Sequence, residues 1–270
     1  MDEPRTLIRR LREDTLARWV LLVPSALLFA LFAIPLAALV LRSFGSDFLS
    51  NALSRQAFQA LSLSVVTSSI TTLVAMIFGT PLAYLLSRSQ SPPRAWIELI
   101  LDLPIVLPPS VAGLALLIAF GRNGLLGGAL GVLGVSLPFT TAAVVIAQTF
   151  VAAPLYVRSA RVGFKSVEPE LIEAAHVEGA NAWQLFREVM VPIAGRVLAS
   201  GLILTWTRAL GEFGATILFA GNLEGVTQTM PMAIYLGFER NLGVALALAV
   251  VLIAVSVVLL ALTKRLEAQS

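Results

Sequence analysis

The chain has 270 residues, of which 57% are hydrophobic and only 13% are charged. Soluble domains carry about 25% charged residues, so this composition excludes an ordinary soluble domain and predicts an all-α integral membrane protein. Cysteine is absent and His176 is the single histidine, which excludes disulfides and the usual thiolate and histidine metal sites. We therefore expect no metal and no cofactor. The formal charge of +3 indicates membrane topology rather than nucleic-acid binding, because the basic residues cluster beside apolar runs.

Apolar runs of about 20 residues predict helices that cross the membrane. We expect six such spans in one transmembrane domain of residues 19–262, over residues 19–41, 61–86, 97–120, 139–157, 197–219 and 242–262. Residues 1–18 and 263–270 are expected to flank this domain in the cytoplasm. The first run is too long for the core of a signal peptide, so we expect it to be retained.

The distribution of lysine and arginine predicts the orientation of these spans. Most of the 19 basic residues fall inside when the cytoplasmic segments are 1–18, 87–96, 158–196 and 263–270. The outside segments then hold only Arg42, Arg55, Arg122 and Arg240. The positive-inside rule therefore predicts that both termini and the loop of residues 166–192 are cytoplasmic.

The third span contains helix-breaking residues in its middle: Pro104, Pro108, Pro109 and Ser110. Because proline removes amide donors and frees carbonyls, we expect this helix to be broken near Pro108, close to the membrane midplane. Broken backbone at that depth must be buried in protein or line a wet cavity. These four residues are therefore candidates for the wall of a translocation pathway, with a bend packed against neighbouring helices as an equal alternative.

Arg208 and Glu212 are charged residues inside the fifth span, four residues apart and so on one helix face. Charges at this depth are costly and are usually paired within a helix bundle. One interpretation is an ion pair within the helix that stabilises a helix interface. The other is a pathway or gate in which Arg208 attracts an anion and Glu212 moderates its field. Gly211 and Gly214 flank the pair and allow a second helix to approach.

The loop of residues 166–192 is polar and favours a helix, with acidic residues near its start. Ala174 and Ala175 leave a smooth surface after Glu173, and Gly179 allows a tight turn or a close approach. A short helix that ends in a glycine turn suits a groove on another protein. The physical alternative, which the residues alone favour, is a solvated loop helix between two spans.

The spacing of this loop resembles the EAA loop of ABC-transporter permease subunits. The matching positions are Glu173, Ala174, Ala175, Gly179, Val189, Val191 and Pro192, with valine in place of the usual isoleucine and leucine. The resemblance implies the type I ABC importer permease fold, with a coupling helix that docks into a cytoplasmic ATPase subunit. It further implies two copies of this chain and two ATPase subunits. Neither Lys165 nor Lys264 lies in a Walker A sequence, so ATP hydrolysis is expected in those partners and not in this chain.

A narrower resemblance involves residues 208–216 with Gly221 and Asn222, which are similar to the fifth-span motif of oxyanion importers. Residues 103–109 and 227–235 look more like the molybdate and tungstate permeases than the sulfate and thiosulfate permeases. The resemblance implies a location in a bacterial or archaeal plasma membrane. It also implies an extracytoplasmic oxyanion-binding protein as a partner.

The external loops are expected to meet this binding protein, with Thr227, Gln228 and Thr229 as candidate contacts. For these single residues, ordinary turn chemistry is an equal alternative. The leading hypothesis is a molybdate or tungstate permease, and its near alternative is a sulfate or thiosulfate permease. A secondary anion transporter or channel without an ATPase is the alternative of another class. A membrane enzyme is a distant third, because His176 has no other histidine or cysteine to act with.

Overall fold

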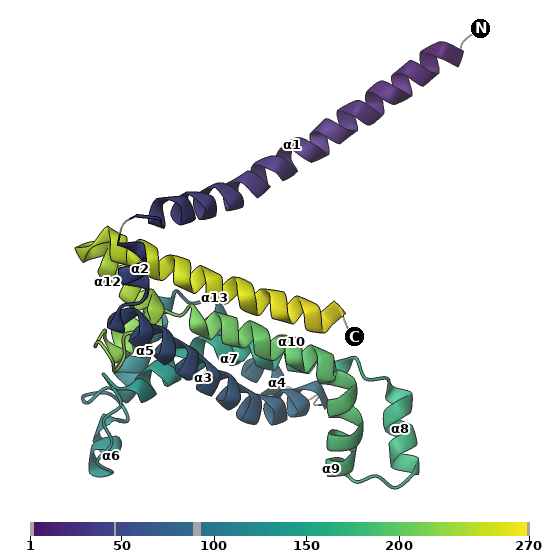
Figure 1. Cartoon of the computed structure of the whole chain (residues 1–270). Coiled ribbons are helices and arrows are strands. Elements are labelled where there is room, and N and C mark those ends of the chain that lie inside the picture. Colours follow the sequence, from purple (N-terminus) through teal and green to yellow (C-terminus); the bar gives the residue numbers. More distant parts are fainter. Residues whose placement is uncertain (1–2, 46, 89–92, 269–270) are drawn as a thin grey trace.

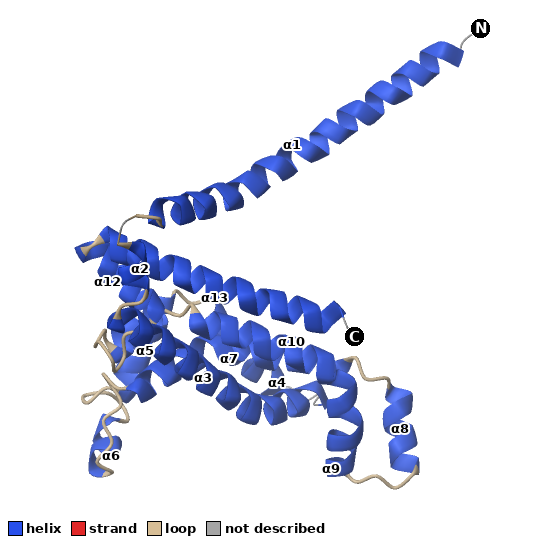
Figure 2. Cartoon of the chain, in the orientation of Figure 1, coloured by secondary structure: helices blue, strands red, loops and turns tan. Residues whose placement is uncertain are grey.

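A computed structural model describes residues 3–45, 47–88 and 93–268 of the chain. Within these ranges the regular structure consists of helices without strands (Figure 2). The predicted all-α class is therefore confirmed.

Four helical stretches are long and apolar enough to cross a membrane: Arg18–Ser43, Arg55–Arg88, Thr141–Lys165 and Ala182–Leu210. A fifth span is formed if the helices α4 (Pro93–Val106) and α5 (Pro109–Phe120) are counted together. By the same measure, Leu242–Val258 of helix α13 (Leu242–Ala268) is a shorter apolar stretch. The described residues thus form a multi-span helical protein, and the sixth span stays a prediction.

Three helices pack side by side at the centre of the molecule: α3 (Arg55–Arg88), α7 (Thr141–Lys165) and α10 (Val191–Leu210) (Figure 1). Small residues allow this close packing. A Cβ atom added at Gly79 would lie 3.0 Å from the side chains of Tyr156 and Val157. One added at Gly201 would lie 2.8 Å from Ser159. Because lipid tails are as apolar as side chains, such close contacts are a main source of helix association in membranes.

Hydroxyl side chains line the buried face of α3 at helical spacing: Ser64, Thr67, Ser68 and Thr71. The Thr71 hydroxyl donates to Oε1 of buried Gln148 on α7, at 3.2 Å. The Ser64 hydroxyl accepts from the backbone N–H of Met230, at 2.7 Å. These bonds satisfy polar groups that neither lipid nor an apolar core would satisfy.

The fifth span differs from the expected range of residues 197–219. Its helix starts within the loop, at α9 (Ala182–Gln184), passes through the π-helical turn η1 (Leu185–Met190) and continues as α10 to Leu210. Pro192 therefore lies inside a continuous helix. Inside an α-helix, proline has no N–H to donate and its ring clashes with the carbonyl four residues earlier. The π-helical turn just before Pro192 changes the hydrogen-bond spacing at that point, which suits a proline there.

The remaining helices lie at the two ends or apart from this centre (Figure 1). The helices α2 (Phe48–Ala52), α6 (Gly127–Val132) and α12 (Met230–Arg240) lie at one end, and α8 (Pro169–Val177) lies with α9 at the other. Helix α1 (Glu3–Ser43) extends away from the body and packs mainly against α13. Its apolar stretch from Arg18 to Ser43 is left exposed, as suits a surface that lipid or another subunit covers.

Candidate functional site

The loop forms a helical hairpin, here called the loop hairpin (residues 168–190), in which α8 runs outward and α9–η1 returns (Figure 1). Gly179 makes the turn after α8, with a φ of +86° that side-chain-bearing residues rarely adopt. The backbone N–H of Ala180 donates to the carbonyl of Ala175 at 2.9 Å, and that of Gly179 donates to His176 at 3.0 Å. This is the pattern of a Schellman cap. No atom lies within 4 Å of a Cβ built at Gly179, so within this chain the glycine serves the turn and not a close approach.

Asn181 starts the returning helix through a capping box. Its side chain accepts from the N–H groups of Trp183 and Gln184, at 3.0 and 2.9 Å, and the Gln184 side chain accepts from the N–H of Asn181. A cap of this kind stabilises a helix by about 1 kcal/mol. The two sides of the hairpin are thus fixed by consecutive caps.

The inner face of the loop hairpin is packed against the ends of α3 and α7. Ile172, Leu185 and Met190 are buried in the same cluster as Phe164 of α7. The ring of Phe186 contacts Tyr84 of α3 edge-on and Phe164 at a tilt, with ring centroids 5.0 and 6.1 Å apart. The loop hairpin is therefore joined to the central helices through side-chain packing and not only through the chain.

The outer face of the loop hairpin is exposed. Glu173 and Ala174 are on this face, while Ala175 is half-buried. Val177 is 87% exposed and Trp183 is 64% exposed. Exposed acids surround these apolar side chains: Glu168, Glu170, Glu173, Glu178 and Glu188. Apolar side chains on a protruding loop with a polar rim are typical of a surface that binds a partner.

Two broken helices meet in the middle of the molecule. The chain breaks at Leu107 and Pro108, where α4 and α5 are bent by 118°, as the prolines predict. It breaks again at residues 211–213, between α10 and α11 (Gly214–Ala220). A Cβ atom added at Gly214 would lie 2.7 Å from Cβ of Pro109 and 3.4 Å from the backbone nitrogen of Ser110. The two breaks therefore lie against each other, and Pro108, Pro109 and Ser110 are exposed beside them.

Arg208 and Glu212 form an ion pair at the second break, with Nη1 and Oε2 2.7 Å apart. The pair does not lie within one helix as expected, because α10 ends at Leu210. Glu212 instead turns back, and its Oε1 accepts the N–H of Ala215 in α11 at 2.9 Å. The Glu212 side chain is 1% exposed, whereas that of Arg208 is 33% exposed. A buried carboxylate thus holds a guanidinium whose other donors are accessible to an anion.

Gly211 and Gly214 have different roles around this pair. Gly214 permits the contact with Pro109, so the expected close approach of a second helix is found there. A Cβ at Gly211 would meet only the carbonyl of Thr207, at 3.8 Å, so no second helix approaches there.

Pro104 does not join this group. It is buried within α4 and lines a groove between α3, α4 and α7. As a candidate for the pathway wall it therefore lies apart from Pro109 and Arg208.

The three candidate contacts for a binding protein are buried. Thr227 accepts from the N–H of Leu223 at 2.9 Å, and the Gln228 side chain accepts from Gln56 of α3 at 3.0 Å. Thr229 precedes the first residue of α12 and is also buried. Within the described part of the chain, only Gln228 of the three bonds to α3, and the burial of all three side chains favours a role in holding the loop over direct contact with a docked protein.

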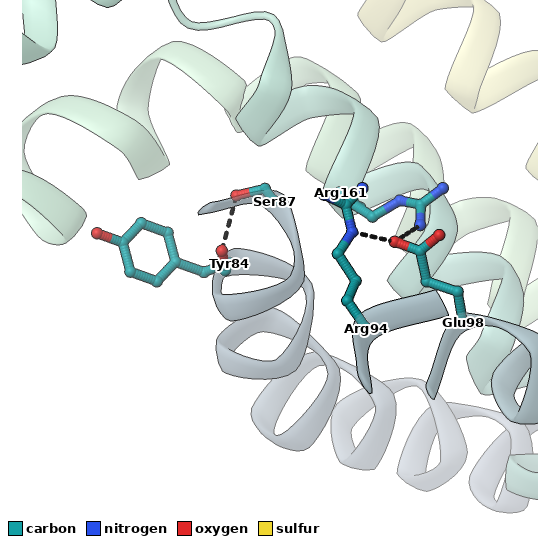
Figure 3. Close-up of polar contacts among 5 residues, drawn as sticks. All are labelled: Tyr84, Ser87, Arg94, Glu98 and Arg161. Atoms are coloured by element: carbon teal, nitrogen blue, oxygen red, sulfur yellow. Dashed lines mark hydrogen bonds and ion pairs between the residues drawn. The ribbon is translucent and has the colours of Figure 1, made fainter. Parts of the chain in front are cut away.

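Sequence reasoning missed a charged cluster at the loop-hairpin end of α4 and α7 (Figure 3). Glu98 of α4 pairs with Arg94, at 2.5 Å, and with Arg161 of α7. In the same view the Ser87 hydroxyl donates to the carbonyl of Tyr84, at 2.7 Å, near the end of α3. An acid at position 98 in an apolar run was the available signal, but its second partner, Arg161, lies more than sixty residues away.

The described residues contain no group of three or more histidines, cysteines or acids that could hold a metal ion.

Residues 75–269 match the family of binding-protein-dependent transport system inner membrane components. The chain belongs to this family. It is therefore a multi-pass inner-membrane permease subunit of an importer, and a secondary transporter or channel is excluded.

Named relatives cover most of the chain. The probable transport system permease protein NifC of Clostridium pasteurianum is 39% identical over 241 residues, 89% of this chain and 84% of that protein. The molybdenum transport system permease protein ModB of Mycobacterium tuberculosis is 39% identical over 246 residues, 90% of this chain and 93% of that protein. The sulfate transport system permease protein CysT of Escherichia coli is 32% identical over 206 residues, 76% of this chain and 74% of that protein.

Among solved structures, a bacterial ABC transporter involved in the import of the acidic polysaccharide alginate has a TM-score of 0.81 with this chain. The match covers 98% of this chain and 99% of that one, at 18% identity. This likeness confirms the ABC importer permease fold.

Proposed function

We propose that this permease forms the pathway for molybdate or tungstate through an importer whose ATP hydrolysis takes place in a separate subunit. The observation that carries the proposal is the 39% identity with a molybdenum transport permease over 90% of this chain and 93% of that protein. The permease has no Walker A sequence of its own, so the energy must come from a partner.

The arrangement of Arg208 and Glu212 is suited to a doubly charged oxyanion. Arg208 offers hydrogen-bond donors and a positive charge at the two breaks, where backbone groups are freed. Glu212 offsets part of that charge through its contact at 2.7 Å. A site of this kind attracts an anion without holding it tightly, as a transport pathway requires.

In this proposal two copies of the permease surround the pathway, and the outer face of each loop hairpin binds one ATPase subunit. ATP binding moves the loop hairpins, and the packing of Phe186 against Phe164 and Tyr84 transmits the motion to α7 and α3. An oxyanion-binding protein delivers the anion from outside. The pathway then alternates between two global states, each favoured by a different ligand. Both termini are cytoplasmic in this arrangement, which the basic residues beside the spans support.

Sulfate is the second candidate, because the sulfate permease CysT is 32% identical over 76% of this chain. Sulfate and molybdate carry the same charge and tetrahedral shape, so Arg208 does not distinguish them. The lower identity and shorter coverage favour molybdate.

ATPase activity of the purified complex in liposomes tests the proposal. The complex would be given its binding protein and then molybdate, tungstate or sulfate in turn. We expect stimulation by molybdate or tungstate and not by sulfate. Stimulation by sulfate alone would assign the permease to sulfate, and the absence of any co-purifying ATPase would overturn the coupled mechanism.

A further inference from the structure

An apolar groove of about 300 Å³ runs between α3, α4 and α7. Its walls include Val74 and Leu82 of α3, Ile100 of α4 and Ala153 of α7, and Thr149 is the single polar residue among those that line it. From Val74 to Leu82 the groove extends about 12 Å along the helix axis. It therefore runs parallel to the spans, as a lipid acyl chain does.

The groove ends beside the charged cluster of Figure 3. Leu101, Pro154 and Val157 line both the groove and the small cleft that Glu98, Asp102, Arg158 and Arg161 share. Arg94, Arg158 and Arg161 thus lie together against two carboxylates, at the end where the loop hairpin also lies.

Two of these arginines retain unused hydrogen-bond donors. Arg158 is exposed and forms no ion pair with the described residues. Arg161 pairs with Glu98, but its Nε atom is buried without a hydrogen-bond partner among the described residues. A phosphate group at the mouth of the groove would accept from the exposed guanidinium of Arg158 and would lie beside the positive charge of Arg161.

We infer that this groove binds an anionic phospholipid of the cytoplasmic leaflet, with an acyl chain between α3, α4 and α7 and the phosphate at Arg158 and Arg161. The inference rests on the proposed orientation, which puts these arginines at the cytoplasmic surface. Basic pockets between spans on that side are suited to anionic headgroups. The lipid would connect α4, one half of the broken third span, to α7.

The shape of this site favours a phospholipid over a free oxyanion as its ligand. A small anion would use the arginines alone and would leave the apolar groove without a role. A phospholipid matches both parts, charge at the mouth and hydrocarbon along the length.

Lipid titration of the complete, delipidated complex tests the inference by native mass spectrometry. Phosphatidylglycerol and phosphatidylcholine with the same acyl chains would be added in graded amounts to the wild type, Arg158→Gln and Ala153→Phe. Arg55→Gln, at the opposite end of α3, is the matched charge control, and Ala129→Phe on α6 is the matched control for size. Molybdate and sulfate would be added as competitors. These binding measurements do not depend on the transported substrate.

We expect the wild type to prefer phosphatidylglycerol, and Arg158→Gln to weaken that binding about fivefold, since one basic residue contributes roughly that factor near an anionic surface. Ala153→Phe should weaken binding of both lipids by filling the groove, and both controls should behave as the wild type. Equal binding of the two lipids, or an unchanged preference in Arg158→Gln, would overturn the inference. Competition by millimolar molybdate or sulfate would also overturn it, because it would assign the arginines to a free anion.

Discussion

Glu212 combines two contacts at one carboxylate, an ion pair with Arg208 and a hydrogen bond from Ala215. We predict that Glu212→Ala destabilises the complex by about 3 kcal/mol, because it leaves Arg208 and a backbone N–H unpaired. Glu212→Gln should cost about half as much, since an amide oxygen still accepts from Ala215. Thermal unfolding in detergent measures the difference, with exposed Glu224→Gln as the control. Equal losses for the alanine and glutamine variants would contradict the two-contact account.

Two substitutions at Gly179 can distinguish the effect of the turn geometry from the effect of a docked partner. Any side chain at its φ of +86° should cost about 1–2 kcal/mol, and a Cβ meets no atom of this chain. Gly179→Ala and Gly179→Leu should therefore destabilise the turn equally. If an ATPase covers the loop hairpin, the leucine variant should lose much more coupled uptake than the alanine variant. Equal uptake in the two variants would argue against a closely fitting partner at this turn.

At the scale of elements, the loop hairpin is connected to the spans by aromatic packing. We predict that Phe186→Ala costs about 2–3 kcal/mol locally, because it removes the ring contacts with Tyr84 and Phe164. The ATPase should still bind, but ATP hydrolysis should drive less uptake. The ratio of transported anion to ATP hydrolysed measures this, with exposed Phe58→Ala as the matched control. An unchanged ratio in Phe186→Ala would show that this packing does not couple ATP hydrolysis to transport.

The sequence predicts some of these elements and not others, for physical reasons. Pro108 and Pro109 act on their own helix, so the break between α4 and α5 is predictable from local chemistry. The break at residues 211–213 lies within a long apolar run, where only Gly211 and Gly214 mark it. The burial of Gln228 depends on Gln56, and that of Met230 on Ser64, which are distant in sequence. Spacing along one chain does not determine such pairings.

At the scale of the whole molecule, the parts are arranged along one direction. The loop hairpin lies at one end, α12 and α6 lie at the other, and the two helix breaks lie between them (Figure 1). Motion of the loop hairpin has a packed route to the breaks through α7 and α10, which contact each other along their lengths. The position of the loop hairpin at one end of this axis agrees with the charge distribution, which predicts that the loop hairpin faces the cytoplasm.

The central claim is that the outer face of the loop hairpin binds an ATPase subunit. The chain has no cysteine, so a single Ala174→Cys variant introduces one thiol on that face. The decisive measurement is the labelling rate of this thiol by a maleimide, in the permease alone and in the complex with its ATPase subunits but without the binding protein. Leu125→Cys, on the exposed segment at the opposite end, is the control. We predict that the complex protects Cys at position 174 at least tenfold and leaves position 125 unchanged. Equal labelling of position 174 with and without the ATPase would contradict the account.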